Sequence, residues 1–255
     1  KKMKKIQLFF AMSFAWIGVQ AQCVITDDVR IAAGTMEASN CGDPVSYQGY
    51  DYATVLIGDQ CWFAENLRSE NYENGDAISA NLNDGDWSST TSGATAVYGE
   101  DAGCNSNSPD INACDPTQSL NEYGRLYNWY AVDDARGLCP SGWHVPTDGE
   151  WTVMTDVLGG ESVAGGQMKT TYGWYQAGNG TNSSGFSGLP GGFRSSIKGV
   201  FDIAGHGGYW WSSSPNGSNA WYRFLYFNDE SVYRSGSYLG DGFSVRCVQD
   251  TAVPE

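Results

Sequence analysis

The side chains best suited to nucleophilic or acid–base chemistry in this sequence are its seven cysteines and two histidines. A thiolate can act as a nucleophile or a soft metal ligand, and an imidazole can move protons near neutral pH. His144 lies in the stretch GWHVP and His206 lies in a glycine-rich loop, and neither has a serine or cysteine partner at a recognisable spacing. We expect His144 to be a hydrogen-bonded structural residue, and we keep His206 as a candidate ligand contact.

The cysteine spacing predicts disulfides, which persist mainly in exported proteins. Spacing alone does not fix connectivity, and Cys23 is left over when the other six pair. The pairs that the spacing favours are Cys41 with Cys61, Cys104 with Cys114, and Cys139 with Cys247.

The N-terminal residues have the layout of a secretory signal peptide, with a basic start, an apolar run from Ile6 to Val19 and small or polar residues at the end. We expect cleavage after Ala21, so that residues 1–21 are the leader and 22–44 an N-terminal extension. A membrane anchor is the alternative, but the run is shorter than the roughly 20 residues that span a bilayer. A lipoprotein signal would require cleavage directly before Cys23, where the flanking glutamines fit poorly.

The charge of the chain limits its partners. The formal net charge is −15, and loss of the four leader lysines makes it −19. Such a chain repels nucleic acids and anionic lipids. We therefore expect a secreted or cell-surface bacterial protein that binds no nucleic acid and does not span the membrane once processed.

Two acidic loops could hold a cation. The stretches NDGD at 83–86 and FNDES at 227–231 supply carboxylates of the kind that calcium prefers. The candidate calcium ligands are Asp84, Asp86 and Asp229. Neither stretch has the full EF-hand pattern, and acidic loops in exported proteins are usually just solvated, so we expect no cofactor and keep calcium as the alternative. Asp133 and Asp134 resemble a glycosidase pair in type only, because neighbouring helical residues point apart.

Aromatic side chains on loops could stack on sugar rings. Trp174 and Tyr175 lie in TTYGWYQAGNG and Trp87 lies in DGDWSS, while Arg194 and Arg223 could add polar contacts. The alternative is that these aromatics cover a small core of the loop region itself. Strand alternation places neighbouring tryptophans of YWWSSS on opposite faces, so at least one is structural. The expected aromatic core is Trp62, Trp129, Trp143, Trp151, Trp210 and Trp211.

The elements that must position these residues are short. Residues 52–57 and 60–63 are predicted to form a hairpin around Gly58-Asp59, and 71–116 to form surface loops. A first helix is predicted between 119 and 137, with Tyr123, Leu126, Tyr127, Tyr130 and Ala131 on one face. A second begins at a capping box formed by Thr147 and Glu150 and ends at Gly159-Gly160. Its expected buried residues are Trp151, Met154, Val157 and Leu158.

Beyond Glu161 the sequence predicts strands and loops without another helix. Residues 221–233 suggest two strands around a turn at Asn228-Asp229. The stretch GFSVRCVQ predicts one strand with a single covered face, whose inward side chains would be Phe243, Val245 and Cys247. We expect one domain over 45–250, with 251–255 as a tail.

Six stretches resemble a known family. VLIGDQCWFAENLR, YGRLYNWYAV, GLCPSGWHVPTDGEW, SGFSGLPGGFR, YWWSSS and GFSVRCV are similar, in this order, to the Fibrobacter succinogenes major paralogous domain of exported bacterial proteins. The resemblance implies a C-type-lectin-like α+β fold, in which two helices flank small twisted antiparallel sheets with long loops. Formylglycine-generating, sulfatase-modifying enzymes share this scaffold. Members of the family are described as surface or secreted modules of unestablished function.

These features favour a binding function over catalysis. A sulfatase-modifying oxidase needs a reactive cysteine pair upstream of the last strand, and no cysteine lies between Cys139 and Cys247. The triplets of sugar-binding C-type lectins, EPN or QPD and WND, are absent as well. We expect a non-catalytic adhesion module that recognises extracellular glycans or a surface protein. The alternatives are a structural component of an extracellular or envelope assembly and, second, the oxidase.

Overall fold

The computed structural model describes residues 40–100 and 104–251. The expected leader, most of the N-terminal extension, Cys23 and residues 252–255 lie outside these ranges. The strands are β1 Val45–Tyr47, β2 Tyr50–Tyr52, β3 Thr54–Ile57, β4 Gln60–Phe63, β5 Thr95–Ala96, β6 Cys104–Ser106, β7 Leu126–Tyr127, β8 Trp143–His144, β9 Phe193–Arg194, β10 Phe201–Ala204, β11 Gly207–Asn216, β12 Asn219–Tyr226, β13 Val232–Tyr238, β14 Phe243–Ser244 and β15 Val248–Gln249. The helices are α1 Asp84–Ser89, α2 Pro116–Tyr123, α3 Trp129–Val132, α4 Asp148–Val157, α5 Ala164–Met168 and a 3₁₀ turn, η1, Tyr175–Ala177.

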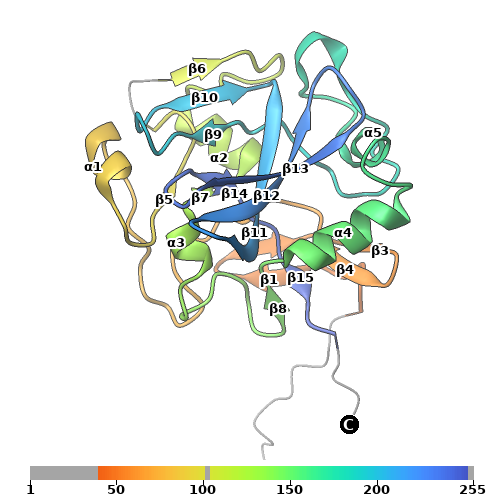
Figure 1. The fold of residues 1–255 in the computed structure, drawn as a ribbon, viewed down its shortest axis with the longest axis horizontal. Coiled ribbons are helices and arrows are strands. Elements are labelled where there is room, and N and C mark those ends of the chain that lie inside the picture. The colour runs from red at the N-terminus through yellow and green to blue at the C-terminus, as the bar shows by residue number, and fades with distance from the viewer. Residues whose placement is uncertain (1–39, 101–103, 252–255) are drawn as a thin grey trace, which may run out of the picture. The chain divides into compact units, whose positions relative to one another are not determined.

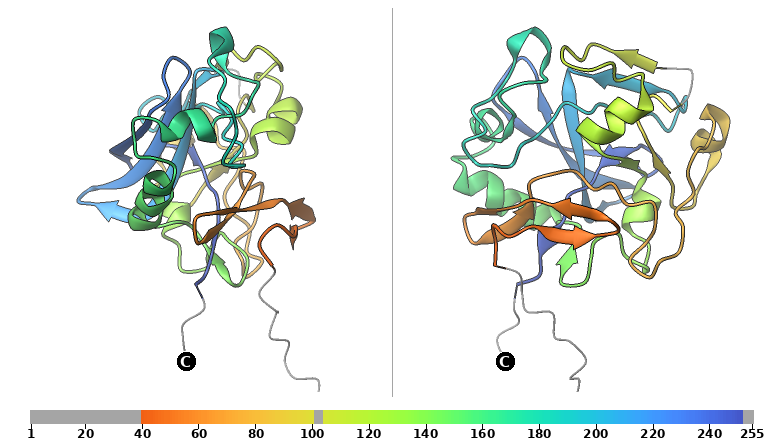
Figure 2. Two further views of the ribbon diagram at one scale, coloured as in Figure 1. Left: turned by 90° about the vertical axis from the view of Figure 1, so that its right-hand side faces the viewer. Right: turned by 180° about the vertical axis from the view of Figure 1, so that it is seen from behind.

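The fold is a mixed α+β arrangement, mostly sheet with few helices, around a central six-stranded sheet (Figure 1). The strand order of this sheet is β13-β12-β11-β14-β7-β5, and the long β11–β12–β13 meander forms one end. A four-stranded sheet has the order β3-β4-β15-β8, and a three-stranded sheet has the order β6-β10-β9. Figure 2 shows β1 to β4 gathered at the lower edge of the molecule, away from β6 and β10.

The central sheet is buried on both faces where the neighbouring tryptophans of β11 lie. Trp210 packs with Trp62 and Trp151 in one cluster, and Trp211 packs with Trp129 and others in a second. The predicted opposite orientation of Trp210 and Trp211 is confirmed, and neither ring is exposed. All six tryptophans assigned to the core from the sequence are buried.

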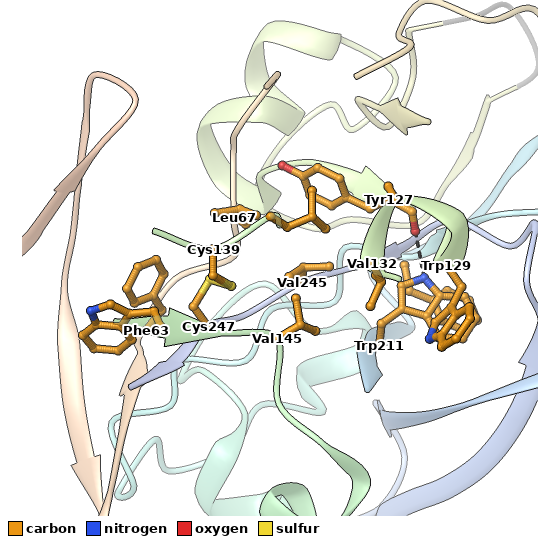
Figure 3. Close-up of a cluster of buried hydrophobic side chains, with 14 of the residues drawn as sticks. Phe63, Leu67, Tyr127, Trp129, Val132, Cys139, Val145, Trp211, Val245 and Cys247 are labelled. Carbon is orange, nitrogen blue, oxygen red and sulfur yellow. Dashed lines mark hydrogen bonds between the residues drawn. A yellow bond between two sulfur atoms is a disulfide. The ribbon is translucent and has the colours of Figure 1, made fainter. Parts of the chain in front are cut away.

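The three predicted disulfides are present: Cys41–Cys61, Cys104–Cys114 and Cys139–Cys247. Figure 3 shows Cys139 and Cys247 within the hydrophobic cluster, close to Phe63 and Val145. The Cys139–Cys247 bridge connects residues 108 positions apart in the chain. It therefore fastens the segment before β8 to the segment before β15.

The first predicted helix is wrong as a single element. α2 ends at Gly124, whose φ is +72°, and a Cβ there would lie 2.9 Å from the Leu67 carbonyl oxygen. Leu126 and Tyr127 then form β7, inside the central sheet between β14 and β5, and α3 follows. A short apolar run that is buried on both faces cannot be distinguished from a buried helical segment by periodicity alone, which explains the error.

The second predicted helix is confirmed as α4, with both hydrogen bonds of the capping box between Thr147 and Glu150. Trp151, Met154 and Leu158 are buried as expected, but Val157 is 54% exposed because it lies on the outer side of the last turn. The expectation of no later helix is wrong, since α5 follows. The two glycines of α5 weaken the helical signal in the sequence. Gly165 packs directly on the backbone of Ser231, which leaves no room for a side chain.

The hairpin of β3 and β4 and the strand pair β12 and β13 are confirmed. The loop region 71–116 contains α1, which the sequence analysis missed. GFSVRCVQ is corrected as well: it forms β14 in the central sheet and β15 in the four-stranded sheet, and residues 243–248 are all buried. Two sheets share this segment, so both of its faces are covered.

Candidate functional site

Two of the predicted sugar-stacking residues are buried, so this part of the prediction is corrected. Trp87 is 0% and Trp174 is 1% exposed. Trp87 lies in α1 under the guanidinium of Arg194, 4.5 Å from its ring centroid, and the Trp174 indole donates to Thr170 Oγ1 at 3.1 Å. Trp174 packs in the same cluster as Trp151 and Trp210, and Trp87 packs in a separate cluster with Tyr98 and Phe201.

The two predicted arginine contacts are structural. Arg194 is 0% exposed and binds the Gly199 carbonyl oxygen and Glu100 Oε1, the latter at 3.0 Å. Arg223 is 2% exposed and donates to Asp148 Oδ1 at 2.7 Å, which fixes the start of α4 to β12. Neither side chain is available to a ligand.

Tyr175 and His206 are brought together by the fold. Their ring centroids lie 4.4 Å apart, and Phe227 packs against both rings. The Tyr175 backbone nitrogen donates to the Gly205 carbonyl oxygen at 2.8 Å, which holds η1 beside β10 and β11. The rings are half-buried and cover one another.

The candidate calcium ligands do not converge, and no three His, Cys, Asp or Glu residues gather as a metal site in the described part of the chain. Asp84 lies 3.7 Å from Arg194 Nη2. Asp86 accepts from the Asn83 side chain, and Asp229 accepts from the Ser231 backbone and the Tyr233 hydroxyl. These carboxylates begin a helix and shape a turn, and neither of the two loops gathers three such ligands among the described residues. Calcium binding by Asp84, Asp86 or Asp229 stays a prediction.

His144 is hydrogen-bonded, as expected. Its Nε2 lies 2.9 Å from Glu150 Oε1 and its Nδ1 lies 2.5 Å from Asp250 Oδ1. The hydrogen bond to Glu150 raises the pKa of His144, against an opposing effect of burial. Burial opposes ionisation of Glu150, but hydrogen bonds from His144 and Thr147 hold the pKa of Glu150 at about 2. Both ring nitrogens are engaged, which fits a structural role.

Two surface cavities meet at Thr91 and Tyr130, and we call them together the Tyr130 groove. It consists of two cavities of about 560 Å³ and 400 Å³ that share Thr91 and Tyr130. The first is bounded by residues 77–79, 91–93 and the chain from Tyr130 to Arg136, and the second by residues 88–91, 196–197 and 238–240. α1 and α3, which contribute to its walls, lie on the same side of the molecule, at the left of Figure 1.

The position of Tyr130 is set by its neighbours in α3. The Trp129 backbone nitrogen donates to the Leu239 carbonyl oxygen at 2.8 Å, and its indole donates to the Ser212 carbonyl oxygen at 2.9 Å. Figure 3 shows Trp129 directed into the core beside Trp211. A half-buried Tyr130 therefore stands on a helix that is anchored to two separate segments.

One buried asparagine ties this helix to the opposite wall. Asn128 caps α3 by accepting from the Ala131 backbone at 3.1 Å, and the same Oδ1 accepts from the Ala94 backbone at 2.9 Å. Its Nδ2 donates to the Ser92 carbonyl oxygen at 2.9 Å. Gly93 completes the floor, because any side chain there would collide with the Tyr72 hydroxyl.

The groove presents hydroxyl groups that the protein itself does not use. Within residues 40–100 and 104–251, no hydrogen-bond partner is found for the side chains of Ser79, Thr91, Ser92, Tyr130, Ser218 and Tyr238. Tyr238 and Ile197, at the rim, are 60% and 72% exposed. The groove thus combines unpaired hydroxyls with exposed aromatic and aliphatic surface.

The first cavity ends in charged residues. Arg136 makes a two-point contact with Asp134, at 2.9 and 2.8 Å, reaches Asp76 at 3.2 Å and lies over the Tyr72 ring. The hydrogen bond to Arg136 holds the pKa of Asp134 at about 2. Asp133 is exposed in the same cavity. Because Arg136 is already paired with two carboxylates, this end of the groove is net negative.

The motifs of the sequence and the fold agree with a known family. A model of the Fibrobacter succinogenes major domain matches residues 55–249. The chain belongs to this family. The match starts ten residues after the expected domain start at Val45, and it ends one residue before the expected end at Asp250. No curated protein and no solved structure matches the chain.

Family membership leaves the site to be identified from this structure. The spacing in residues 119–137 predicts Tyr130 on a buried helical face, and no sequence pattern indicates Tyr238. The one local signal is the run of hydroxyl residues from Ser88 to Ser92. In the described ranges, no helix has the length and apolar character needed to cross a membrane.

Proposed function

We propose that this chain is a secreted or cell-surface binding module without catalytic activity, and that the Tyr130 groove binds an extracellular glycan. The observation that carries the proposal is the set of unpaired hydroxyls beside Tyr130 and Tyr238. Sugar rings stack on aromatic faces, and their hydroxyls exchange hydrogen bonds with side-chain hydroxyls. Proteins commonly place such recognition residues on loops held by a rigid frame.

The charge of the groove selects the glycan class. Asp133 and Asp134 repel acidic sugars, and Arg136 is held by its own carboxylate partners. A neutral glycan suits this lining better than an anionic one, because it need not displace an ion pair or bury an unpaired charge.

The scaffold and location form part of the same proposal. The α+β fold, with its long loops, supports a C-type-lectin-like arrangement, and the three disulfides support export to an oxidising compartment. The absence of catalysis is supported by the engagement of the chemically capable side chains. Six cysteines are bridged, His144 lies between two carboxylates, and His206 packs among aromatic rings.

A glycan array with matched variants tests the proposal. Tyr130→Ala and Tyr238→Ala should each weaken neutral-glycan binding about fivefold or more, because loss of one stacked ring costs on the order of 1 kcal/mol or more. Tyr172→Ala is the control, since Tyr172 is 48% exposed and lies outside the groove.

Thermal melts should show that all three variants are folded. Failure of the parent to bind any neutral glycan, on arrays and on insoluble polysaccharide, would reject the glycan proposal. An equal loss in Tyr172→Ala would place the site elsewhere. Binding to a purified surface protein that survives Tyr130→Ala would point to a different surface.

A further inference from the structure

A separate cavity of about 390 Å³ brings two arginines together. Arg68 follows β4, and Arg125 lies between α2 and β7, yet both line this cavity together with Tyr50, Glu70 and Asn121. The cavity shares no lining residue with the Tyr130 groove. In a chain of net charge −15, two guanidinium groups on one cavity are a distinctive local charge.

Arg125 is 6% exposed, but only some of its hydrogen-bond donors have partners in the described part of the protein. Its Nε donates to the Arg68 carbonyl oxygen at 3.2 Å, and its Nη2 pairs with Glu70. No hydrogen bond of Nη1 is found among the described residues. By contrast, the buried Arg223 uses both of its terminal nitrogens on Asp148 and Thr152.

Arg68 is also held in place, and its guanidinium also has a hydrogen-bond donor without a partner among the described residues. Its guanidinium lies 4.1 Å from the centroid of the Tyr50 ring, and Nη2 donates to the Asn121 carbonyl oxygen at 3.0 Å. Its Nε is buried and has no hydrogen-bond partner within the described residues. Glu65 lies 3.8 Å away, but it already accepts from the Tyr50 hydroxyl and the Ala53 backbone.

Glu70 is the one acidic residue among the described residues that line the cavity. Its side chain is 66% exposed, whereas the Arg125 side chain is 7% exposed. An exposed carboxylate gains little from such a pair and can turn into solvent at a small cost. The internal ion pair therefore marks the place where an outside carboxylate would bind.

We propose that this cavity binds the carboxylate of a small ligand, for example that of a uronic acid unit, which displaces Glu70 from Arg125 and also engages Arg68. The planar guanidinium fork matches a carboxylate at two points, which gives directional recognition in addition to charge attraction. This site is independent of the proposed glycan groove, and it takes a ligand of opposite charge preference.

Titration calorimetry with sodium D-glucuronate, D-glucose and sodium acetate at constant ionic strength tests the proposal. Glucuronate should bind, glucose should not, and acetate should bind more weakly because it lacks the sugar. Glu70→Gln should tighten glucuronate binding about fivefold, since it removes the internal competitor. Glu161→Gln is the control, because it makes the same change of charge at an exposed position outside the cavity.

Arg68→Gln should weaken glucuronate binding at least tenfold, and Arg125→Gln should do the same if its thermal melt shows a folded protein. The proposal is overturned if glucuronate fails to bind, or if Glu70→Gln behaves like Glu161→Gln. Acetate binding as tight as glucuronate would show that the carboxylate alone is recognised, without a contribution from the sugar. Neutral-glycan binding by the parent and its loss in Tyr130→Ala are read separately, so the two proposals can fail independently.

Discussion

Arg246 brings a charged side chain into the centre of the molecule, although strand alternation predicts it on an uncovered face. It is 0% exposed, and burial lowers its pKa to about 9. Its guanidinium donates to the Asn66 side chain and to the carbonyl oxygens of Phe63, Phe186 and Ser187. A residue type that usually indicates the surface here joins three segments of the core through hydrogen bonds.

The same difficulty explains the misplaced ligand contacts. Trp87, Trp174, Arg194 and Arg223 have side chains that suit a sugar site, but all four are buried. The residue type determines which interactions a side chain can make. Its burial depends on which segments, distant in the sequence, pack against it. The hydrogen bonding of His144 could be predicted, and one of its two partners, Glu150, is close in the sequence. The burial of rings over which long loops close could not be predicted.

At the residue scale, His144 and Glu150 predict a pH dependence of stability. The pKa of His144 is raised above 6.5, so its contribution is complete below that value and is lost as pH rises through the folded pKa. The pKa of Glu150 falls from 4.5 to about 2, so its contribution is lost as pH falls below 4.5. The free energy of unfolding from this pair should be greatest between about pH 4.5 and 6.5.

Denaturant unfolding of the parent and His144→Gln across pH 3 to 9 measures this effect. The difference in unfolding free energy between the two proteins should be largest inside the window and shrink on both sides. His206→Gln is the control, because it leaves the contacts with Glu150 and Asp250 in place. A constant difference across the whole pH range would contradict the prediction.

At the scale of elements, short pieces were the hardest to predict. α4 carries its own start signal in the capping box, and the β3–β4 hairpin carries its turn residues, so both were found from the sequence. β7 has two residues and gains its strand geometry from β14 and β5, which come from other parts of the chain. Such an element has no local signature, and its two buried residues resembled a helical face.

Asn128 gives a prediction at this scale, since one side chain stabilises both α3 and the 92–94 segment. Asn128→Ala should lower the free energy of unfolding by about 2 to 3 kcal/mol, because it leaves buried backbone groups unpaired. It should also weaken neutral-glycan binding by loosening both walls of the Tyr130 groove.

The matched control is Asn83→Ala. Asn83 also caps a helix, α1, but it is exposed, so its loss should cost about 1 kcal/mol. Unfolding in denaturant gives both values, and equal losses would show that the buried contacts of Asn128 add nothing beyond a helix cap.

At the scale of the whole molecule, the disulfides should contribute unequally. The chain-entropy model gives about 4.7 kcal/mol for a closed loop of 100 residues and about 3 kcal/mol for one of 15. Cys139–Cys247 spans 108 positions and Cys104–Cys114 spans 10. Replacing the first pair with alanines should therefore reduce the free energy of unfolding by about 2 kcal/mol more than replacing the second.

Denaturant unfolding of the two double variants provides the comparison, with the Cys41–Cys61 variant as an intermediate case of 20 positions. The opposite ranking, with the shortest loop costing most, would show that local packing outweighs loop closure in this fold.

The Tyr130 groove could not be predicted from the sequence. The family could be predicted because it depends on short sequence motifs. The disulfide pairs and the buried tryptophans could be predicted because they depend mainly on residue type. The Tyr130 groove is assembled from residues near 79, 91, 130, 197 and 238, and no spacing within the chain relates them. Its position depends on α3 being anchored under the end of β13, a contact that only the folded molecule defines.

The disulfide connectivity also sets how the domain would respond to mechanical tension. A pull applied at residues 40 and 251 passes through Cys41–Cys61 and Cys139–Cys247, so the chain within each of these closed loops carries no load. The β11–β12–β13 meander lies inside the larger loop and is shielded from stretching. Extension is confined largely to the chain between Cys61 and Cys139, which holds Thr91 and Tyr130. Strong tension on a tethered molecule would therefore deform the groove, while the disulfide keeps the central meander from being extended.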